Sequence, residues 1–157
     1  MKREKFSPTQ AQEVAAAFAR NEVDYMFIGK SGAILLGYPG TTQDVDVFPR
    51  KGSENGRRIV NALRDMGFEV DPVLEAEIIR GKDFVQIKEG PFDIDLVFAP
   101  DGIESYEDAK SRIDTSSGFP VANIRDIIES KRAAGRPRDA IELPQLQDFR
   151  RTYEEKN

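Results

Sequence analysis

The chain has 157 residues, of which 39% are apolar and 32% are charged, a length and balance that suit one globular domain with one core. It contains no cysteine and no histidine, which excludes disulfides, imidazole bases and Cys/His zinc sites, and leaves hard, oxygen-binding metals such as Mg²⁺ or Mn²⁺. The formal net charge of −5 disfavours extended binding to nucleic acid, although it permits a local contact with an RNA end.

Capping residues, apolar runs and alternating patterns predict the elements of the first half of the chain. Ser7 is a good helix cap and Pro8 fits the first helical turn, so a helix begins there. Asp44 to Phe48 alternates polar and apolar residues, which is typical of a strand with two different faces. In chain order we expect a helix at 8–21, a buried strand at 25–28, a short helix at 33–36, a strand at 44–48, a helix at 54–66 that is capped by Ser53, and a possible strand at 68–70.

The second half predicts a hairpin followed by helices. Two β-like runs at 84–88 and 92–98 flank Glu89-Gly90-Pro91, so an antiparallel hairpin is expected, whereas 73–80 is ambiguous between helix and strand. Further helices are expected at 105–112, at 123–134 with Asn123 at its start, and from the break at 135–137 to about residue 150, with fraying at 154–157. The pattern predicts an α/β (α+β) fold in which 1–157 is one domain, with a mixed central sheet covered by helices and a C-terminal helical segment at 123–151 packed on it.

Nothing in the sequence predicts an association with a membrane. No stretch approaches the roughly 20 apolar residues that a membrane-spanning helix needs. Met1 to Lys5 is charged and leads into polar residues, so no apolar signal segment follows it. We therefore expect a cytoplasmic protein without membrane partners.

Gly29-Lys30-Ser31 looks like the end of a P-loop, but the rest of that motif is missing. A P-loop needs a glycine five residues before its last glycine, and position 24 is an aspartate. What remains is a strand, a turn that contains glycine, and a helix N-terminus, whose backbone N–H groups can bind phosphate. The alternative is an ordinary tight connection between a strand and a helix.

Two pairs of aspartates are the main candidates for a site. Asp44 and Asp46 lie two residues apart in one predicted strand, so both point to the same face. Asp93 and Asp95 repeat this arrangement in a second strand. If the two strands are neighbours, three or four carboxylates converge, and such a cluster is a usual holder of two Mg²⁺ ions. If they are not neighbours, each pair is an ordinary solvated strand edge.

The run FIGKSGAILLGYPGTTQDVDVF resembles the signature of the DNA polymerase β-like nucleotidyltransferase superfamily: a strand, a small-residue turn, a spacer, an Asp-x-Asp pair and a third carboxylate on a later strand. The segment TTQDVDV is similar to the form found in minimal bacterial members related to toxin and abortive-infection nucleotidyltransferases. The tail VANIRDIIESKRAAGRPRDAIELPQL is similar to the C-terminal helices of that subgroup. The resemblance covers most of 25–146 and implies a nucleotidyltransferase fold.

By position, the resemblance implies a role for each motif residue. Gly29 is the first motif glycine, Asp44 and Asp46 are paired metal ligands, and Asp95 is the third carboxylate, with Asp93 as the alternative. The nucleotide-binding residues would be Gly29, Lys30, Ser31, Thr42, Lys131 and Arg136. Two positions depart from the family pattern: Lys30 replaces a second glycine or serine, and Gly40 stands where many relatives have arginine.

The implied activity is transfer of a nucleoside monophosphate from a nucleoside triphosphate (NTP) to a hydroxyl of an RNA end, a protein or a small molecule, with Mg²⁺ or Mn²⁺ as cofactor. Lys131 and Arg136 would approach the triphosphate or the acceptor; the alternative for both is a solvated helix face. One competing hypothesis is an inactive module that binds a nucleotide or a partner protein, for example in a toxin–antitoxin-like system. Another is a domain that Ca²⁺ or Mg²⁺ merely stabilises.

Overall fold

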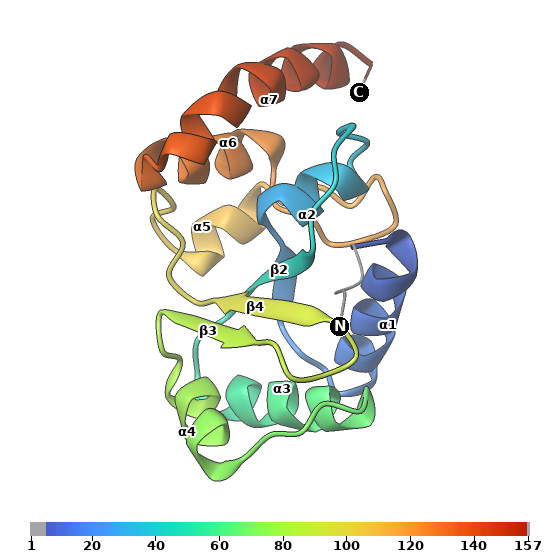
Figure 1. Ribbon diagram of the computed structural model, residues 1–157, viewed down its shortest axis with the longest axis vertical. Coiled ribbons are helices and arrows are strands. Elements are labelled where there is room, and N and C mark those ends of the chain that lie inside the picture. The colour runs from blue at the N-terminus through green and yellow to red at the C-terminus, as the bar shows by residue number, and fades with distance from the viewer. Residues whose placement is uncertain (1–5, 157) are drawn as a thin grey trace.

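A computed structural model describes residues 6–156. These residues form seven α-helices and a four-stranded sheet (Figure 1). The predicted class, a mixed sheet covered by helices, is confirmed. In chain order the elements are α1 (Pro8–Arg20), β1 (Tyr25–Phe27), α2 (Gly29–Leu35), β2 (Asp44–Pro49), α3 (Ser53–Asp65), α4 (Pro72–Arg80), β3 (Phe84–Ile87), β4 (Asp93–Val97), α5 (Tyr106–Ser111), α6 (Ile124–Ala134) and α7 (Pro137–Lys156).

The strand order of the sheet is β1-β2-β4-β3. β2 pairs antiparallel with β1 and parallel with β4, and β3 and β4 form the predicted antiparallel hairpin. The parallel pair is possible because a long crossover that contains α3, α4 and β3 connects β2 to β4. The two strands that carry the aspartate pairs are therefore direct neighbours in the middle of the sheet.

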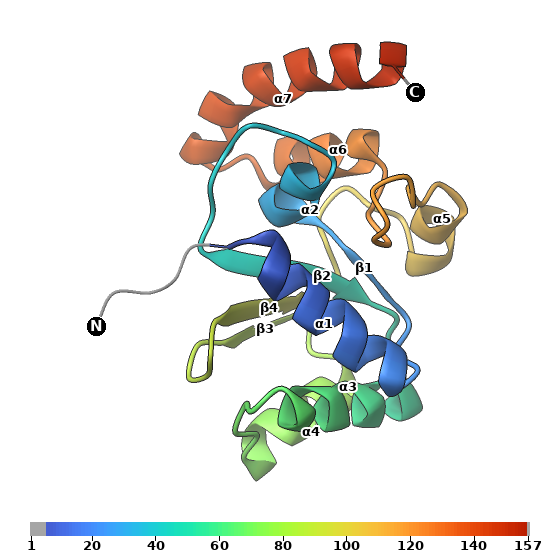
Figure 2. The same ribbon diagram turned by 90° about the vertical axis from the view of Figure 1, so that its right-hand side faces the viewer.

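Helices cover both sides of this sheet. α3 and α4 lie on one side, and α2, α6 and α7 lie on the other (Figure 2). The apolar residues of β2 and β4 share a face because side chains alternate along a strand: Val45 pairs with Ile94 and Val47 with Leu96, and all four are fully buried. No helix among residues 6–156 is long and apolar enough to cross a membrane.

The C-terminal helices are part of the same core. Ile127 of α6 and Leu146 of α7 are fully buried and belong to one hydrophobic cluster with the sheet residues. At the far end of α7, Glu154 accepts hydrogen bonds from Arg125 at 2.7 Å and from Arg150 at 2.9 Å. α7 therefore reaches Lys156, beyond the predicted end at about residue 150. The expected fraying at 154–157 is wrong for residues 154–156, which are helical, and Asn157 lies outside the described residues.

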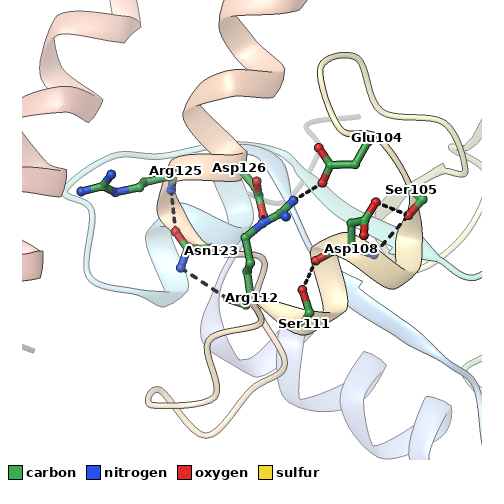
Figure 3. Close-up of polar contacts among 8 residues, drawn as sticks. All are labelled: Glu104, Ser105, Asp108, Ser111, Arg112, Asn123, Arg125 and Asp126. Carbon is green, nitrogen blue, oxygen red and sulfur yellow. Dashed lines mark hydrogen bonds and ion pairs between the residues drawn. The ribbon is translucent and has the colours of Figure 1, made fainter.

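Polar contacts fix the start of α6 (Figure 3). The Nε of Arg112 donates to Asp126 at 2.9 Å, and its guanidinium also pairs with Glu104. Asn123 caps the helix, since its side-chain oxygen accepts from the backbone N–H of Arg125 at 2.9 Å. The start of α6 is thus tied to the end of α5, which limits how the rest of α6 can move over the sheet.

Three local predictions differ from the structure. α2 begins at Gly29, directly after β1, and not at residue 33. Gly52 and not Ser53 is the N-cap of α3, because the chain enters that helix through a glycine conformation with φ of 157°. The possible strand at 68–70 is absent from the described residues: the N–H of Phe68 donates back to Leu63 at 3.0 Å and closes the end of α3.

The ambiguous segment at 73–80 is helical and belongs to α4. Asp71 caps this helix, since its side chain accepts from the backbone N–H of Leu74 at 2.8 Å. Pro72 occupies the first helical position, where its missing N–H has no cost. This N-terminal signature, rather than apolar periodicity, distinguishes helix from strand here.

Candidate active site

The parallel pairing of β2 and β4 brings both aspartate pairs onto one face of the sheet. Asp44 lies directly opposite Asp93, and Asp46 lies directly opposite Asp95. Because in-register residues of neighbouring strands point the same way, all four carboxylates share the face opposite to the buried valines of β2. The condition for their convergence, that the two strands are neighbours, is therefore met.

Asp46 and Asp95 form the closest pair in this group. Burial raises the pKa of Asp46 well above its usual value, and the negative charges of Asp95 and Asp44 raise it further. Burial and the charge of Asp44 also raise the pKa of Asp95, to about 6. A hydrogen bond between the two acids raises the pKa of Asp46 and lowers that of Asp95.

The donor chemistry of this face suits a hard divalent cation. Asp95 is only 6% exposed, and its Oδ1 is buried without a hydrogen-bond partner. A buried carboxylate oxygen is costly unless something compensates its charge, and carboxylate oxygens are the preferred ligands of Mg²⁺. As the side chains lie, no three or more acidic side chains among residues 6–156 are arranged to hold a metal ion. The metal site on Asp44, Asp46 and Asp95 or Asp93 thus stays a prediction.

The Gly29 turn lies against Asp46. Gly29 has a positive φ of 65°, and a Cβ added there would come within 2.4 Å of Oδ2 of Asp46. The backbone N–H of Ile28 donates to the carbonyl oxygen of Asp46 at 2.9 Å. Glycine is therefore required at position 29 both by its backbone conformation and by the closeness of the carboxylate.

Ser31 and Thr42 support the backbone of β2. The hydroxyl of Ser31 is fully buried; it accepts from the N–H of Asp46 at 2.9 Å and donates to the carbonyl of Ile28 at 3.2 Å. The Oγ1 of Thr42 accepts from the N–H of Asp44 at 3.5 Å, a long hydrogen bond. Ser31 is thus placed to position Asp46, and its hydroxyl is engaged within the protein rather than exposed to a phosphate.

Cationic side chains from the C-terminal helices approach the acidic face. The positive charge of Lys131 favours the ionised form of Asp46, and the charge of Asp46 in turn contributes to the raised pKa of Arg136. Lys30, at the start of α2, forms an ion pair with Glu142 of α7 at 3.3 Å. The three predicted cations are therefore gathered on the side of the sheet where the carboxylates lie.

Two acidic residues that the sequence analysis did not select hold these cations. Asp139 is fully buried and pairs with Lys131 at 3.4 Å and with the Nε of Arg136 at 2.7 Å. Although burial raises the pKa of Asp139, its hydrogen bonds with Arg136 and the charge of Lys131 lower it overall. Glu142 lies 3.9 Å from Lys131. One sequence signal could have identified Asp139, since it is an acid in the first turn after the helix break. Its side chain accepts from the backbone N–H of Arg136 at 3.2 Å and so caps α7.

A cavity of about 540 Å³ lies away from this site, between the end of α2 and the second half of α7, and its lining includes Leu36, Phe149 and Tyr153. None of the predicted site residues lines it, so the carboxylate face is defined by charge and register and not by this cavity. Comparison with protein-family models gives no match, and comparison with curated proteins gives no significant match.

Proposed function

We propose that the protein is a metal-dependent nucleotidyltransferase with the fold of the DNA polymerase β-like superfamily. The observation that carries the proposal is the parallel register that sets Asp46 beside Asp95, next to the Gly29 turn. The proposal is further supported by the order of β1, the Gly29 turn, α2 and the Asp-x-Asp strand β2, and by the further carboxylates on the neighbouring strand β4.

Asp44, Asp46 and Asp95 are the proposed metal ligands. Asp95 is favoured over Asp93 as the third ligand because Asp95 and Asp44 both act on the pKa of Asp46. When bound to these carboxylates, Mg²⁺ or Mn²⁺ would supply positive charge for the entering and leaving oxygens of the transfer. Asp93 lies opposite Asp44 and adds negative charge beside Asp95.

The proposed reaction is an in-line displacement at the α-phosphorus of an NTP. The oxygen of the acceptor hydroxyl forms a bond with the α-phosphorus, while the bond from that phosphorus to the oxygen that bridges to the β-phosphate breaks. Pyrophosphate leaves with the electron pair of the broken bond. Since the chain contains no histidine, a carboxylate of the acidic face would accept the hydroxyl proton.

Lys30, Lys131 and Arg136 are the proposed ligands of the triphosphate. Their charges lie on the side of the sheet where the β- and γ-phosphates would need them. Asp139 would then be a positioning residue, because it holds Lys131 and Arg136 beside the acidic face. Ser31 would position Asp46 through the backbone hydrogen bond of that residue.

The test is transfer of label from α-labelled NTPs, with Mg²⁺ or Mn²⁺, to acceptors in a cell extract. We expect transfer by the wild type and by Asp148→Asn, which alters an exposed carboxylate on α7. We expect no transfer by Asp44→Asn or Asp46→Asn variants whose melting temperatures show that they fold. Equal labelling by all four proteins would remove Asp44 and Asp46 from the mechanism.

A second candidate is an inactive module that binds nucleotide, and the position of Lys30 favours it. The side chain of Lys30 occupies the place of a small family residue and is already paired with Glu142. Calorimetry with Mg²⁺ and each NTP separates the two functions, since binding without transfer to any acceptor supports the module. A rise in melting temperature with Mg²⁺ or Ca²⁺ that NTP does not extend would instead support a metal-stabilised domain.

A further inference from the structure

A stripe of three exposed side chains begins on the acidic face of the edge strand β3 and ends at the first residue after that strand. Phe84, Gln86 and Lys88 are exposed, whereas the alternate residues Val85 and Ile87 are buried. Gln86 lies directly opposite Asp95 in the hairpin, and Phe84 lies opposite Val97. The phenylalanine, which is 46% exposed, thus lies one diagonal step from the proposed catalytic carboxylate.

The stripe and the proposed phosphate-binding cations lie on opposite sides of the carboxylates. α2, which carries Lys30, contacts both β2 and α6, and α6 carries Lys131, whereas β3 follows β4 at the far edge of the sheet. An in-line displacement needs the acceptor and the leaving pyrophosphate on opposite sides of the α-phosphorus. If pyrophosphate leaves toward the cations, the acceptor hydroxyl must enter from the side of β3.

The chemistry of the stripe fits a nucleotide. An exposed aromatic ring stacks on a base, which is worth about 1–3 kcal/mol per base in single-strand recognition. The amide of Gln86 can donate to and accept from a base edge, and Lys88 can pair with a phosphate. Lys88 is exposed and lies two residues after Gln86, which faces Asp95 in the hairpin. Phe84 and Lys88 are four residues apart, roughly 13 Å along the strand, which suits one chain end and not an extended nucleic acid.

We propose that Phe84, Gln86 and Lys88 form an acceptor subsite that binds the terminal nucleotides of an RNA, with a base on Phe84, a phosphate at Lys88 and the terminal ribose hydroxyl directed to Asp95. The catalytic part of this inference rests on the proposed nucleotidyl transfer. Binding at β3 does not require that transfer occurs, so the two can be tested separately.

The chain contains no tryptophan, so Phe84→Trp introduces a unique fluorescent reporter into the stripe. We expect a trinucleotide of adenylate to quench this fluorescence to saturation, and ribose 5-phosphate, which has no base, to leave it unchanged. Val73→Trp is the matched control, because Val73 is 71% exposed on α4, on the other side of the sheet. Adding Lys88→Glu to Phe84→Trp should weaken trinucleotide binding about tenfold and lower the salt slope by about 0.7, the value for one phosphate contact on a single strand.

Saturable quenching at position 84 that needs the base and Lys88 supports the subsite, whether or not label is transferred. Absent quenching, equal quenching at position 73, or quenching that Lys88→Glu leaves unchanged would overturn it. A transfer assay separates the two proposals: Phe84→Ala should raise the KM for an RNA acceptor at least fivefold while the KM for NTP stays unchanged. Transfer that depends on Asp46 but goes to a protein, unaffected by Phe84→Ala, would overturn the subsite and leave the transferase intact.

Discussion

The two faces of the paired strands β2 and β4 differ in chemistry where Asp44–Val47 lies opposite Asp93–Leu96. On the face toward α3, Val45 and Leu96 are fully buried among apolar neighbours. On the opposite face, burial and the charges of neighbouring acids raise the pKa values of Asp46 and Asp95. Burying an aliphatic side chain contributes about 1.5–3 kcal/mol, whereas crowding ionised acids costs stability. The apolar face therefore stabilises the fold. The crowded acids of the other face lower the free energy of unfolding, and the apolar face compensates for that cost.

The largest expected effect separates activity from stability on the acidic face. Asp46→Asn should lower nucleotidyl transfer by about 10³-fold or more, about 4 kcal/mol of transition-state stabilisation, because it removes a ligand charge from the site. Its melting temperature should stay the same or rise, since a crowded acid is lost. Transfer rates and thermal melts measured on the same preparation provide the check. A variant that loses stability in proportion to its activity would place Asp46 among the structural residues.

On the apolar face the same size of change should act on stability alone. Leu96→Ala leaves a cavity beside Val47, its partner in the register, and should lower the free energy of unfolding by about 2–5 kcal/mol. The activity of the molecules that remain folded should change little. Urea denaturation followed by circular dichroism measures the loss. A loss below about 1 kcal/mol would show that this face does not carry the stability assigned to it.

The Gly29 turn lies against Asp46 and leads from β1 into α2, so its substitution should affect both activity and stability. Gly29→Ala puts a Cβ against Oδ2 of Asp46 in a left-handed backbone conformation. We expect a loss of about 1–3 kcal/mol in the free energy of unfolding and a displaced Asp46 with reduced transfer. Gly118→Ala is the control, because Gly118 also has a positive φ but has nothing within 4 Å of an added Cβ. Equal effects of the two substitutions would show that strain alone, and not contact with Asp46, is responsible.

The smallest expected effect is a pH dependence that the acidic face adds to stability. The folded pKa of Asp95, about 6, lies above its ordinary value of 3.8, so the folded state binds more protons than the unfolded state between these values. The contribution of Asp95 to the free energy of unfolding should therefore fall as pH rises from about 4 to about 6, by at most about 3 kcal/mol. Acids with lowered pKa values, such as Asp139, act in the opposite direction. The measurement is thus the difference between wild type and Asp95→Asn across this range.

Mg²⁺ sharpens the same experiment. Metal binding competes with protons, so Mg²⁺ should raise the melting temperature more at pH 8 than at pH 5. The rise should disappear in Asp95→Asn and persist in Asp148→Asn. A wild-type and Asp95→Asn pair with identical pH profiles and identical Mg²⁺ responses would contradict the coupling of Asp95 to its neighbours.

Local signals in the sequence predict much of this fold. Ser7 and Asn123 mark helix starts, the alternation in Asp44 to Phe48 gives the two faces of β2, and Glu89-Gly90-Pro91 marks the hairpin. Each of these signals lies within a few residues of the feature that it predicts. The element types are accordingly correct for most of the chain.

Contacts between distant segments could not be predicted in this way. The pairing of Asp44 with Asp93 joins strands that a long crossover separates, and alternation specifies a face but not a neighbour. Near the end of α7, Glu154 pairs with Arg125 at the start of α6, a contact between two helices that local sequence patterns do not specify. Asp139 was missed as part of the site because an acid in a first helical turn usually caps its own helix and need not hold a lysine of another.

The buried carboxylate of Asp139 has a consequence for ligand selection in the proposed enzyme. It pairs with both Lys131 and Arg136 while the nucleotide is away, and it is fully buried. An anion must therefore compete with an internal counter-ion to reach these cations. A triphosphate offers several phosphate groups to Lys30, Lys131 and Arg136 at once, whereas a singly phosphorylated compound offers one, so in the proposed enzyme the same contact would favour triphosphates over the abundant small phosphates of a cell.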